Sequence, residues 1–311
     1  MTPISAGARR NQNGGPLRII YIMGPGRGGS TLLERVLNSA PAAFALGEFH
    51  TFWRIEHKDL VCSCGSPVPR CSFWNEVIET AGVGRAELNA LRRGEDAIVR
   101  TKYLVKRRFS LPGIAADPAV RSFIELQRVL FETISTVSGC ETLVDSSKAT
   151  QRAWILATMQ EVSILRLYRN ATDTIVSWRL PKWDKGLNTP MRKMSIQRAA
   201  FEWWRIENFG RRLGRSYPIT RINYEEFVAS PKDVLNDIND ESIRDLTAQI
   251  AWLDERTVNP SQCYHSLNGN PDRYETGPIT IGPPKVRHGE LPSREVPLIR
   301  AVGGLLTALY H

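Results

Sequence analysis

Hydrophobic residues in this chain occur either in short continuous runs or at helical spacing within longer segments. The run at 17–23 is typical of a buried parallel strand, and the segment 30–40 (STLLERVLNSA) places its apolar residues on one face of a helix. A second series of segments alternates strand, helix, strand and helix, at 142–144, 149–160, 163–168 and 170–180. This repeated β-α-β order predicts an α/β fold with a central parallel sheet and covering helices.

The rest of the chain carries mainly helical patterns. Helices are expected at 121–137, 195–213, 225–238, 242–253 and 294–310, and one further strand at 218–224. The segment 259–284 is rich in Gly, Pro and Asn, and long irregular loops of this kind are often functional lids. We therefore expect a single domain over 17–311, preceded by a disordered leader over 1–16.

Composition sets broad limits on the function. The chain has 311 residues, of which 42% are hydrophobic, and its net charge of +9 favours an anionic partner. Basic residues gather at Arg92, Arg93, Arg100, Lys102, Lys106, Arg107 and Arg108. Because aromatic residues are not interleaved regularly enough to form stacking platforms, this segment is interpreted as a solvated basic face, and a nucleic-acid partner is not expected.

The location of the protein is also predicted from hydrophobicity. Residues 1–16 lack the apolar core of a signal peptide, and no apolar run approaches the length of a transmembrane segment. We therefore expect a soluble, cytoplasmic protein.

The cysteines are concentrated in one short segment. Cys62, Cys64 and Cys71 lie within CSCGSPVPRC, with His57 upstream. These four residues could bind zinc, but the C-x-C start departs from the usual C-x₂-C spacing. The alternatives are a labile disulfide and a compact turn with free thiols.

A glycine-rich loop follows the first strand. It reads GPGRGGST over 24–31, and Ser30 occupies the position of the lysine in the nucleotide-triphosphate motif G-x-x-x-x-G-K-[ST], while Arg27 supplies a cation earlier in the loop. Backbone N–H groups and the positive end of the following helix converge on an anion in such loops. The sequence therefore predicts a P-loop-type three-layer α/β/α fold whose phosphate site departs from the ATP and GTP pattern.

A second pair of donors lies at another junction of strand and helix. Arg169 ends a predicted strand, and Ser177 follows it by eight residues on the next helix. A guanidinium and a hydroxyl on the same side of such a junction can bind one phosphate from two directions. Together with the first loop, this arrangement indicates a ligand with two separated phosphate groups.

These motifs make the chain similar to sulfotransferases that use 3′-phosphoadenosine 5′-phosphosulfate (PAPS). That family has a [RK]-x-G-[ST]-[ST]-L loop for the 5′-phosphosulfate and an R-x₇-S motif for the 3′-phosphate, which correspond to Arg27–Leu32 and to Arg169 with Ser177. The resemblance extends from about residue 17 to the C-terminus, through the stretches 46–48, 144–148, 223–227 and 265–273. Gly28 departs from the usual Ser or Thr. The resemblance also implies that 49–118 is an insertion-like region on the acceptor side.

The resemblance assigns roles to individual residues. It implies donor binding by Gly26, Arg27, Gly28, Gly29, Ser30, Thr31, Leu32, Arg169, Ser177, His265, Asn270 and Arg273. Glu48 is the expected base, with a pKa raised toward neutrality by partial burial, and His50 is the alternative base. Lys148 and Arg27 would stabilise negative charge during transfer. No metal is expected to be required.

The implied reaction is an in-line transfer of a sulfuryl group to a hydroxyl, or an amine, of a small molecule, carbohydrate or lipid. Two alternatives remain at this stage. One is a P-loop small-molecule kinase, disfavoured by Ser30, and the other is a non-catalytic nucleotide- or RNA-binding protein of the same fold. The sequence leaves the acceptor and the oligomeric state open.

Overall fold

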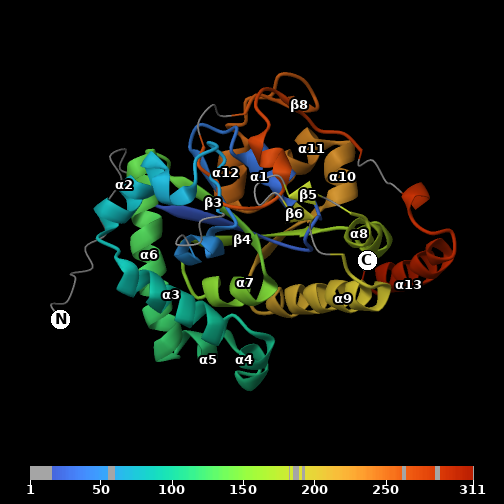
Figure 1. Ribbon diagram of the computed structural model, residues 1–311, viewed down its shortest axis with the longest axis horizontal. Coiled ribbons are helices and arrows are strands. Elements are labelled where there is room, and N and C mark those ends of the chain that lie inside the picture. Colours follow the sequence, from blue (N-terminus) through green and yellow to red (C-terminus); the bar gives the residue numbers. More distant parts are fainter. Residues whose placement is uncertain are drawn as a thin grey trace.

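The central feature of the computed structural model is a five-stranded parallel sheet (Figure 1). The structure describes residues 16–54, 60–181, 183–184, 189–190, 193–260, 264–283 and 288–310. The strand order is β2 (Ala43–Gly47), β3 (Thr142–Lys148), β1 (Arg18–Met23), β4 (Val162–Tyr168) and β7 (Ile219–Asn223). Because β1 is flanked by β3 on one side and β4 on the other, the loop after β1 lies where ligands collect in open α/β sheets.

The central strand β1 shows why helices cover both faces of the sheet. Ile19, Tyr21 and Met23 pack toward one face, and Ile20 and Ile22 pack toward the other, as the two-residue period of a strand requires. The first face is covered by α6 (Pro118–Ser138), α7 (Thr150–Leu156) and α9 (Ile196–Leu213), and the second by α1 (Ser30–Leu37), α10 (Tyr224–Ala229), α11 (Pro231–Asn236) and α12 (Glu241–Thr247). The predicted P-loop-type three-layer α/β/α fold is therefore confirmed.

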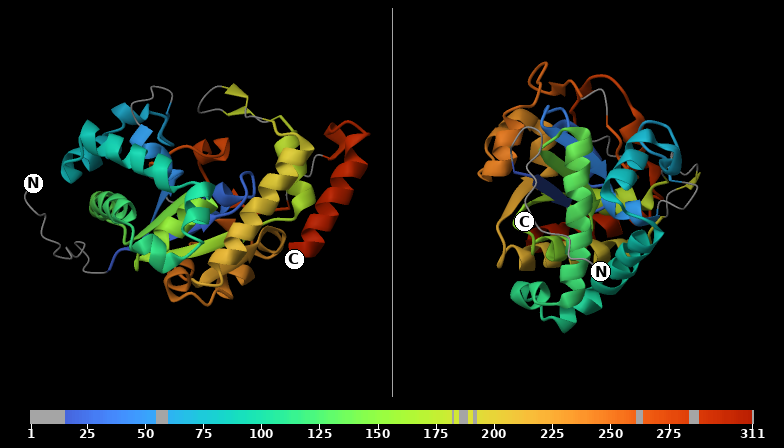
Figure 2. Two further views of the ribbon diagram at one scale, coloured as in Figure 1. Left: turned by 90° about the horizontal axis from the view of Figure 1, so that it is seen from below. Right: turned by 90° about the vertical axis from the view of Figure 1, so that its left-hand side faces the viewer.

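A third group of helices closes one end of the sheet. The helices α8 (Ala171–Arg179) and α13 (Glu295–Tyr310) pack with α9 around Trp203, which is fully buried (Figure 2). Arg179 of α8 forms a bidentate ion pair with Glu295 at the start of α13, with nitrogen–oxygen distances of 2.6 to 3.0 Å. This packing fixes α8, which carries Ser177, relative to the sheet.

Three parts of the chain differ from the sequence-based expectation. Strand β2 was not predicted, and the segment before Pro118 forms helices: η1 (Phe49–Arg54), η2 (Val68–Arg70), α2 (Ser72–Ala81), α3 (Arg85–Ile98), α4 (Thr101–Lys106) and α5 (Leu111–Ala115). The expected helix 225–238 is divided into α10 and α11, because Pro231 cannot continue the hydrogen-bond pattern of the first helix. The short elements of the C-terminal part are β8 (Thr257–Val258), η3 (Pro271–Tyr274), β9 (Ile279–Thr280) and η4 (His288–Glu290), and β5 (Trp183–Asp184) pairs with β6 (Thr189–Pro190).

Some sequence-based interpretations concern residues outside the described part. The expected leader lies outside it except for Pro16, and so does His57. Most of the basic residues on α3 and near α4 are exposed, as expected for a solvated face. Within the part of the chain that the structure describes, no helix is both long enough and apolar enough to cross a bilayer.

A buried ionic network ties the middle helices to the end of β3. Arg152 of α7 is fully buried, and its guanidinium donates to Glu95 Oε2 at 2.7 Å and to Gln127 Oε1. Its Nε lies 3.6 Å from Asp145 Oδ2, and Asp145 in turn accepts a hydrogen bond from the backbone N–H of Ser147 at 2.9 Å. Burial raises the pKa of Asp145, and the charge of Arg152 opposes this rise. The network therefore holds the backbone that leads into Lys148.

Candidate active site

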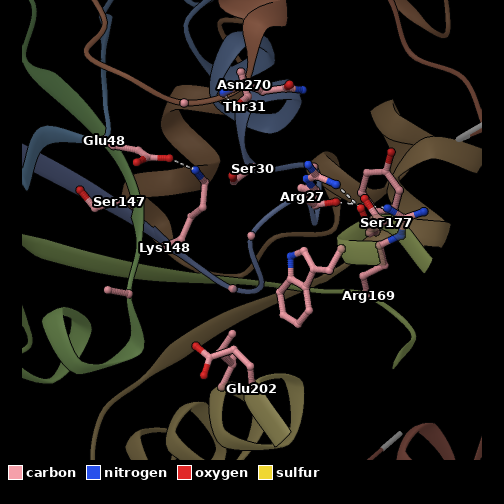
Figure 3. Close-up of a pocket in the computed structure, with 18 of the residues that line it drawn as sticks. Arg27, Ser30, Thr31, Glu48, Ser147, Lys148, Arg169, Ser177, Glu202 and Asn270 are labelled. Carbon is pink, nitrogen blue, oxygen red and sulfur yellow. Dashed lines mark hydrogen bonds and ion pairs between the residues drawn. The ribbon is translucent and has the colours of Figure 1, made fainter. Parts of the chain in front are cut away.

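A cleft of about 680 Å³ opens at the carboxyl ends of β1, β3 and β4 (Figure 3). The residues assigned from the sequence that line it are Gly26, Arg27, Gly29, Ser30, Thr31, Leu32, Glu48, Lys148, Arg169, Ser177 and Asn270. Gly28, His50, His265 and Arg273 do not line it. The cleft thus brings together the glycine-rich loop, the Arg169–Ser177 pair and the two catalytic candidates Glu48 and Lys148.

The glycine-rich loop leads directly into α1. Gly29 precedes the first helical residue with φ of 96°, and a Cβ at this position would come within 2.2 Å of a ring carbon of Tyr224. Only glycine fits both the backbone conformation and this close contact. The loop therefore places the N-terminal backbone of α1, with Ser30 and Thr31, against the cleft.

The positively charged side chain of Arg27 lies on the side of the loop that faces α8. Its Nη1 donates to the carbonyl oxygens of Ser177 and Leu180, the latter at 2.9 Å, while its Nη2 is buried and has no hydrogen-bond partner in the described part of the chain. Burial lowers the pKa of Arg27. Among the described residues, no carboxylate lies within ion-pair distance of this guanidinium. The loop therefore holds a partly buried cation whose charge no described carboxylate neutralises.

Arg169 lies behind the loop, at the end of β4. It is 7% exposed, and its Nη1 donates to the carbonyl oxygen of Arg27 at 3.2 Å. Its contacts with carboxylates are long, 3.9 Å from Nε to Glu225 Oε1 and 4.0 Å from Nη2 to Asp173 Oδ2, and among the described residues Nε has no hydrogen-bond partner. The guanidinium lies 4.7 Å from the ring centroid of Tyr224. This second cation is therefore oriented against the loop and keeps an N–H group free for an anion.

Glu48 and Lys148 form an ion pair in the cleft. Lys148 Nζ donates to Glu48 Oε1, and Asn268 Nδ2 donates to Glu48 Oε2 at 3.0 Å. Both charged side chains are mostly buried, since that of Lys148 is 16% exposed and that of Glu48 is 17% exposed. Burial alone would raise the pKa of Glu48, but Lys148 and then His50 act in the opposite direction, and the net shift is a lowered pKa. The expectation of a raised pKa is thus wrong, because the ammonium of Lys148 lies directly on the carboxylate.

His50 lies close to this pair but does not line the cleft. Burial lowers its pKa to about 4, although the negative charge of Glu48 acts to raise it. Its Nδ1 is buried and finds no hydrogen-bond partner within the ranges that the structure describes, and its backbone N–H donates to Ser147 Oγ at 3.3 Å. His50 is therefore a neutral imidazole at physiological pH, set back from the cleft.

The segment 264–274 packs over the end of β2 and the start of α1. Leu267 donates its N–H to Leu46 at 2.8 Å and accepts from the N–H of Glu48 at 2.6 Å. Asn270 donates its N–H to Thr31 Oγ1 at 3.3 Å. This segment therefore places Asn268 against Glu48 and Asn270 against Thr31 at the end of the glycine-rich loop.

The other two residues assigned to this segment point elsewhere. Arg273 is 4% exposed and donates to the carbonyl oxygen of Val61 at 3.0 Å, and His265 contacts Cys62 and Cys71. Both are therefore directed toward the cysteine-containing loop, away from the cleft.

Several residues of the site were not identified from the sequence. Ser147, Glu202 and Tyr224 line the cleft, and Asn268 contacts Glu48. Glu34 is the most informative of them, because it lies on the apolar face of α1 and is almost fully buried. A carboxylate at a core position of a helix is the signal that could have revealed it.

Glu34 accepts hydrogen bonds from residues next to the two catalytic candidates. Its Oε1 accepts from the N–H of Gly47 at 2.5 Å, and its Oε2 accepts from Ser146 Oγ at 2.8 Å. Gly47 immediately precedes Glu48, and Ser146 lies two residues before Lys148. Burial raises the pKa of Glu34 from 4.5 to about 7, while the hydrogen bonds from Ser146 and Gly47 act to lower it.

The raised pKa of Glu34 predicts a pH-dependent stability difference. Protonated Glu34 stabilises the fold below pH 4.5, and this contribution is lost as the pH rises through about 7, because the unfolded chain then binds fewer protons than the folded one. Glu34→Gln keeps both hydrogen bonds, with the amide N–H donating to Ser146, and does not titrate. As the pH rises from 4.5 to about 7, we expect the free energy of unfolding of Glu34→Gln to increase relative to that of the wild type by up to about 3 kcal/mol, since one pKa unit corresponds to about 1.4 kcal/mol.

Urea unfolding at a series of pH values measures this difference. The exposed Glu125→Gln serves as the control and should show a constant offset from the wild type. A constant offset for Glu34→Gln as well would contradict a carboxyl group that titrates near neutrality.

Comparisons with known proteins concern the family and the fold of the chain. A sequence profile described as Sulfotransferase family matches residues 19–241. Among solved structures, the sulfotransferase domain from the curacin biosynthetic pathway superimposes with a TM-score of 0.50 at 17% identity, over 92% of this chain and 96% of that chain. The sulfotransferase domain of the olefin synthase of Synechococcus PCC 7002 matches with a TM-score of 0.47 at 19% identity, over 99% and 98% of the two chains. No curated protein matches the sequence. At such identities the structural likeness concerns the fold.

Proposed function

The chain belongs to the sulfotransferase family and is a transferase, and we propose that it moves a sulfuryl group from 3′-phosphoadenosine 5′-phosphosulfate to a hydroxyl or amine of a small molecule, carbohydrate or lipid. One observation carries the proposal. A single cleft joins two incompletely neutralised guanidinium groups, Arg27 and Arg169, to a buried Glu48–Lys148 pair.

The polar groups of the cleft fit a donor with two phosphate ends. Arg27 Nη2, which has no hydrogen-bond partner among the described residues, would bind the 5′-phosphosulfate together with Ser30, Thr31 and the N-terminal backbone of α1. The unpartnered Nε of Arg169, together with Ser177, would bind the 3′-phosphate. Asn270 would lie over the same loop. We leave His265 and Arg273 out of the donor site, because both face the cysteine-containing loop.

The roles of the catalytic candidates follow from their positions. When bound, the donor supplies a sulfuryl group whose bond to the 5′-phosphate breaks as the bond to the acceptor oxygen forms. Glu48 would accept the proton of the acceptor hydroxyl, and Asn268 would hold the orientation of its carboxylate. Lys148 would place its ammonium on the negative charge that develops during transfer. Gln151, Glu202, Arg205 and Ile206 line the remaining wall and would contact the acceptor.

Thermal shift with two nucleotides tests the proposal. Adenosine 3′,5′-bisphosphate should raise the melting temperature without any divalent cation, because a ligand that binds only the native state stabilises it. ATP with Mg²⁺ should have little effect, since Ser30 replaces the lysine of the triphosphate motif. Stabilisation by ATP alone, with strict dependence on Mg²⁺, would favour the kinase alternative and contradict the proposal.

Arg169→Ala should weaken the binding of adenosine 3′,5′-bisphosphate about 30-fold, because a charge-assisted hydrogen bond contributes about 2 kcal/mol. Isothermal titration calorimetry measures this change. The control is Arg198→Ala, which removes the same charge from the exposed surface of α9. Wild-type affinity in Arg169→Ala would remove this residue from the donor site.

A further inference from the structure

A second cluster of polar ligands lies beside the cleft but outside it. It consists of Cys62, Cys64 and Cys71, from the loop before α2, and His265, from the segment that covers β2. Their sulfur and nitrogen ligand atoms all lie within 4.8 Å of one another. The two segments that provide these ligands are far apart in the sequence, since His265 follows Cys62 by 203 positions.

Four of the six distances within the cluster match those around a tetrahedral zinc ion. Cys71 Sγ lies 3.8 Å from both Cys62 Sγ and Cys64 Sγ. His265 Nδ1 lies 3.6 Å from Cys62 Sγ and 3.3 Å from Cys71 Sγ. With Zn–S bonds of about 2.3 Å and Zn–N bonds of about 2.0 Å, a tetrahedron has S···S edges of about 3.8 Å and S···N edges of about 3.5 Å.

From this geometry we infer that Cys62, Cys64, Cys71 and His265 bind one zinc ion in a structural site. All four positions of the tetrahedron are taken by protein ligands, which is the arrangement of structural zinc sites and leaves no position open for a substrate. The fourth ligand is therefore His265, whereas the sequence had suggested His57, which lies outside the described residues.

A disulfide accounts for this arrangement less well. Cys71 is equally distant from two other sulfur atoms, and a disulfide would select one of them at about 2 Å and leave the third thiol beside the histidine. A shared cation instead explains why three sulfur atoms and one imidazole nitrogen converge on one point.

The backbone around the ligands is held in place independently of any ion. Ser63 Oγ donates to the carbonyl oxygen of Tyr264 at 2.8 Å and accepts from the N–H of Ser266 at 2.9 Å. The ring of His265 stacks on Phe73 with a centroid distance of 4.8 Å and an interplanar angle of 3°. These contacts orient Nδ1 toward the sulfur atoms, as the supporting contacts of metal ligands commonly do.

The position of the site indicates what the zinc ion does. His265 is two residues before Leu267, which pairs with β2, and three residues before Asn268, which contacts Glu48. The zinc ion would therefore fasten the segment 264–270 to the loop before α2 and keep Asn268 on the base candidate. This inference concerns metal binding and stability and is independent of the reaction proposed above.

Metal analysis of the purified full-length protein tests the inference. We expect about one zinc ion per chain by inductively coupled plasma mass spectrometry, and less than about a tenth of that in Cys71→Ser and His265→Gln. Cys140→Ser is the matched control and should keep the full content, because Cys140 lies outside the cluster. A wild-type protein without stoichiometric zinc, even after incubation with zinc under reducing conditions, would overturn the inference.

Two measurements on the wild type do not depend on the folding of the variants. The cobalt-substituted protein should show the visible absorption of tetrahedral cobalt bound to thiolates. After chelation and unfolding without reductant, all five cysteines should react with a thiol reagent. A cobalt spectrum without these bands, or a loss of two reactive thiols from a disulfide, would contradict the zinc site. Neither result would affect the binding of adenosine 3′,5′-bisphosphate, so the two proposals can fail separately.

Discussion

Glu48→Gln is expected to lower kcat about 100- to 10,000-fold, the range that removal of a general base commonly produces. The amide is isosteric and can still contact Asn268, but it cannot accept a proton from the acceptor. The affinity for adenosine 3′,5′-bisphosphate should stay within a few fold of the wild type, because the residues proposed to bind this nucleotide lie on the loop and at Arg169. Transfer of labelled sulfate and isothermal titration calorimetry measure the two quantities.

Two further variants separate Glu48 from other groups near the cleft. Glu202 lines the same cleft from α9 and pairs with Arg205, so Glu202→Gln removes a carboxylate from the opposite wall. His50→Asn removes the alternative base, whose pKa of about 4 and position behind the cleft make it a weak one. Both should keep kcat within about tenfold of the wild type. Retained turnover in Glu48→Gln, with loss in either of these variants, would transfer the role of base to that residue.

Lys148→Met is expected to lower kcat about 100- to 1,000-fold. This is the range observed when an enzyme loses one group that stabilises developing negative charge. It should also change the pH profile. Among the groups near Glu48, Lys148 acts most strongly to lower its pKa, so removing the ammonium raises that pKa. The acidic limb of the kcat/KM profile should therefore move to higher pH.

The controls for this variant distinguish charge from packing. Lys148→Arg keeps the charge beside Glu48, so its acidic limb should stay close to the wild-type position. Lys102→Met removes a lysine from the exposed surface of α4 and should change neither kcat nor the profile. An unchanged acidic limb in Lys148→Met would show that the ion pair does not set the pKa of the base.

The elements with strong local patterns were predictable from the sequence. The continuous apolar run of β1 and the helical spacing in α6 and α9 identify these elements with nearly their observed bounds. Strand β2 was missed because it has only five residues, AFALG, and lacks the β-branched residues typical of strands. The helices α2 to α5 were missed because their outer faces are polar, so packing into the core cluster that they share with α6 defines them rather than propensity.

The candidate site followed from motifs, but its electrostatics did not. The loop at Arg27 and the Arg169–Ser177 spacing are local signals, and parallel-sheet topology is sufficient to bring them to one edge. The lowered pKa of Glu48 depends on Lys148, which is 100 positions away in the sequence and reaches the carboxylate only in the folded chain. In the same way, the contacts of His265 with two cysteines depend on tertiary packing that no spacing rule specifies.

The most direct test of the proposed donor site is a crystal structure of the protein with adenosine 3′,5′-bisphosphate. We predict that the 5′-phosphate lies on the loop between Arg27 and Thr31 and that the 3′-phosphate contacts Arg169 and Ser177. A nucleotide bound elsewhere, or bound with its phosphates away from both arginines, would contradict the assignment of the cleft.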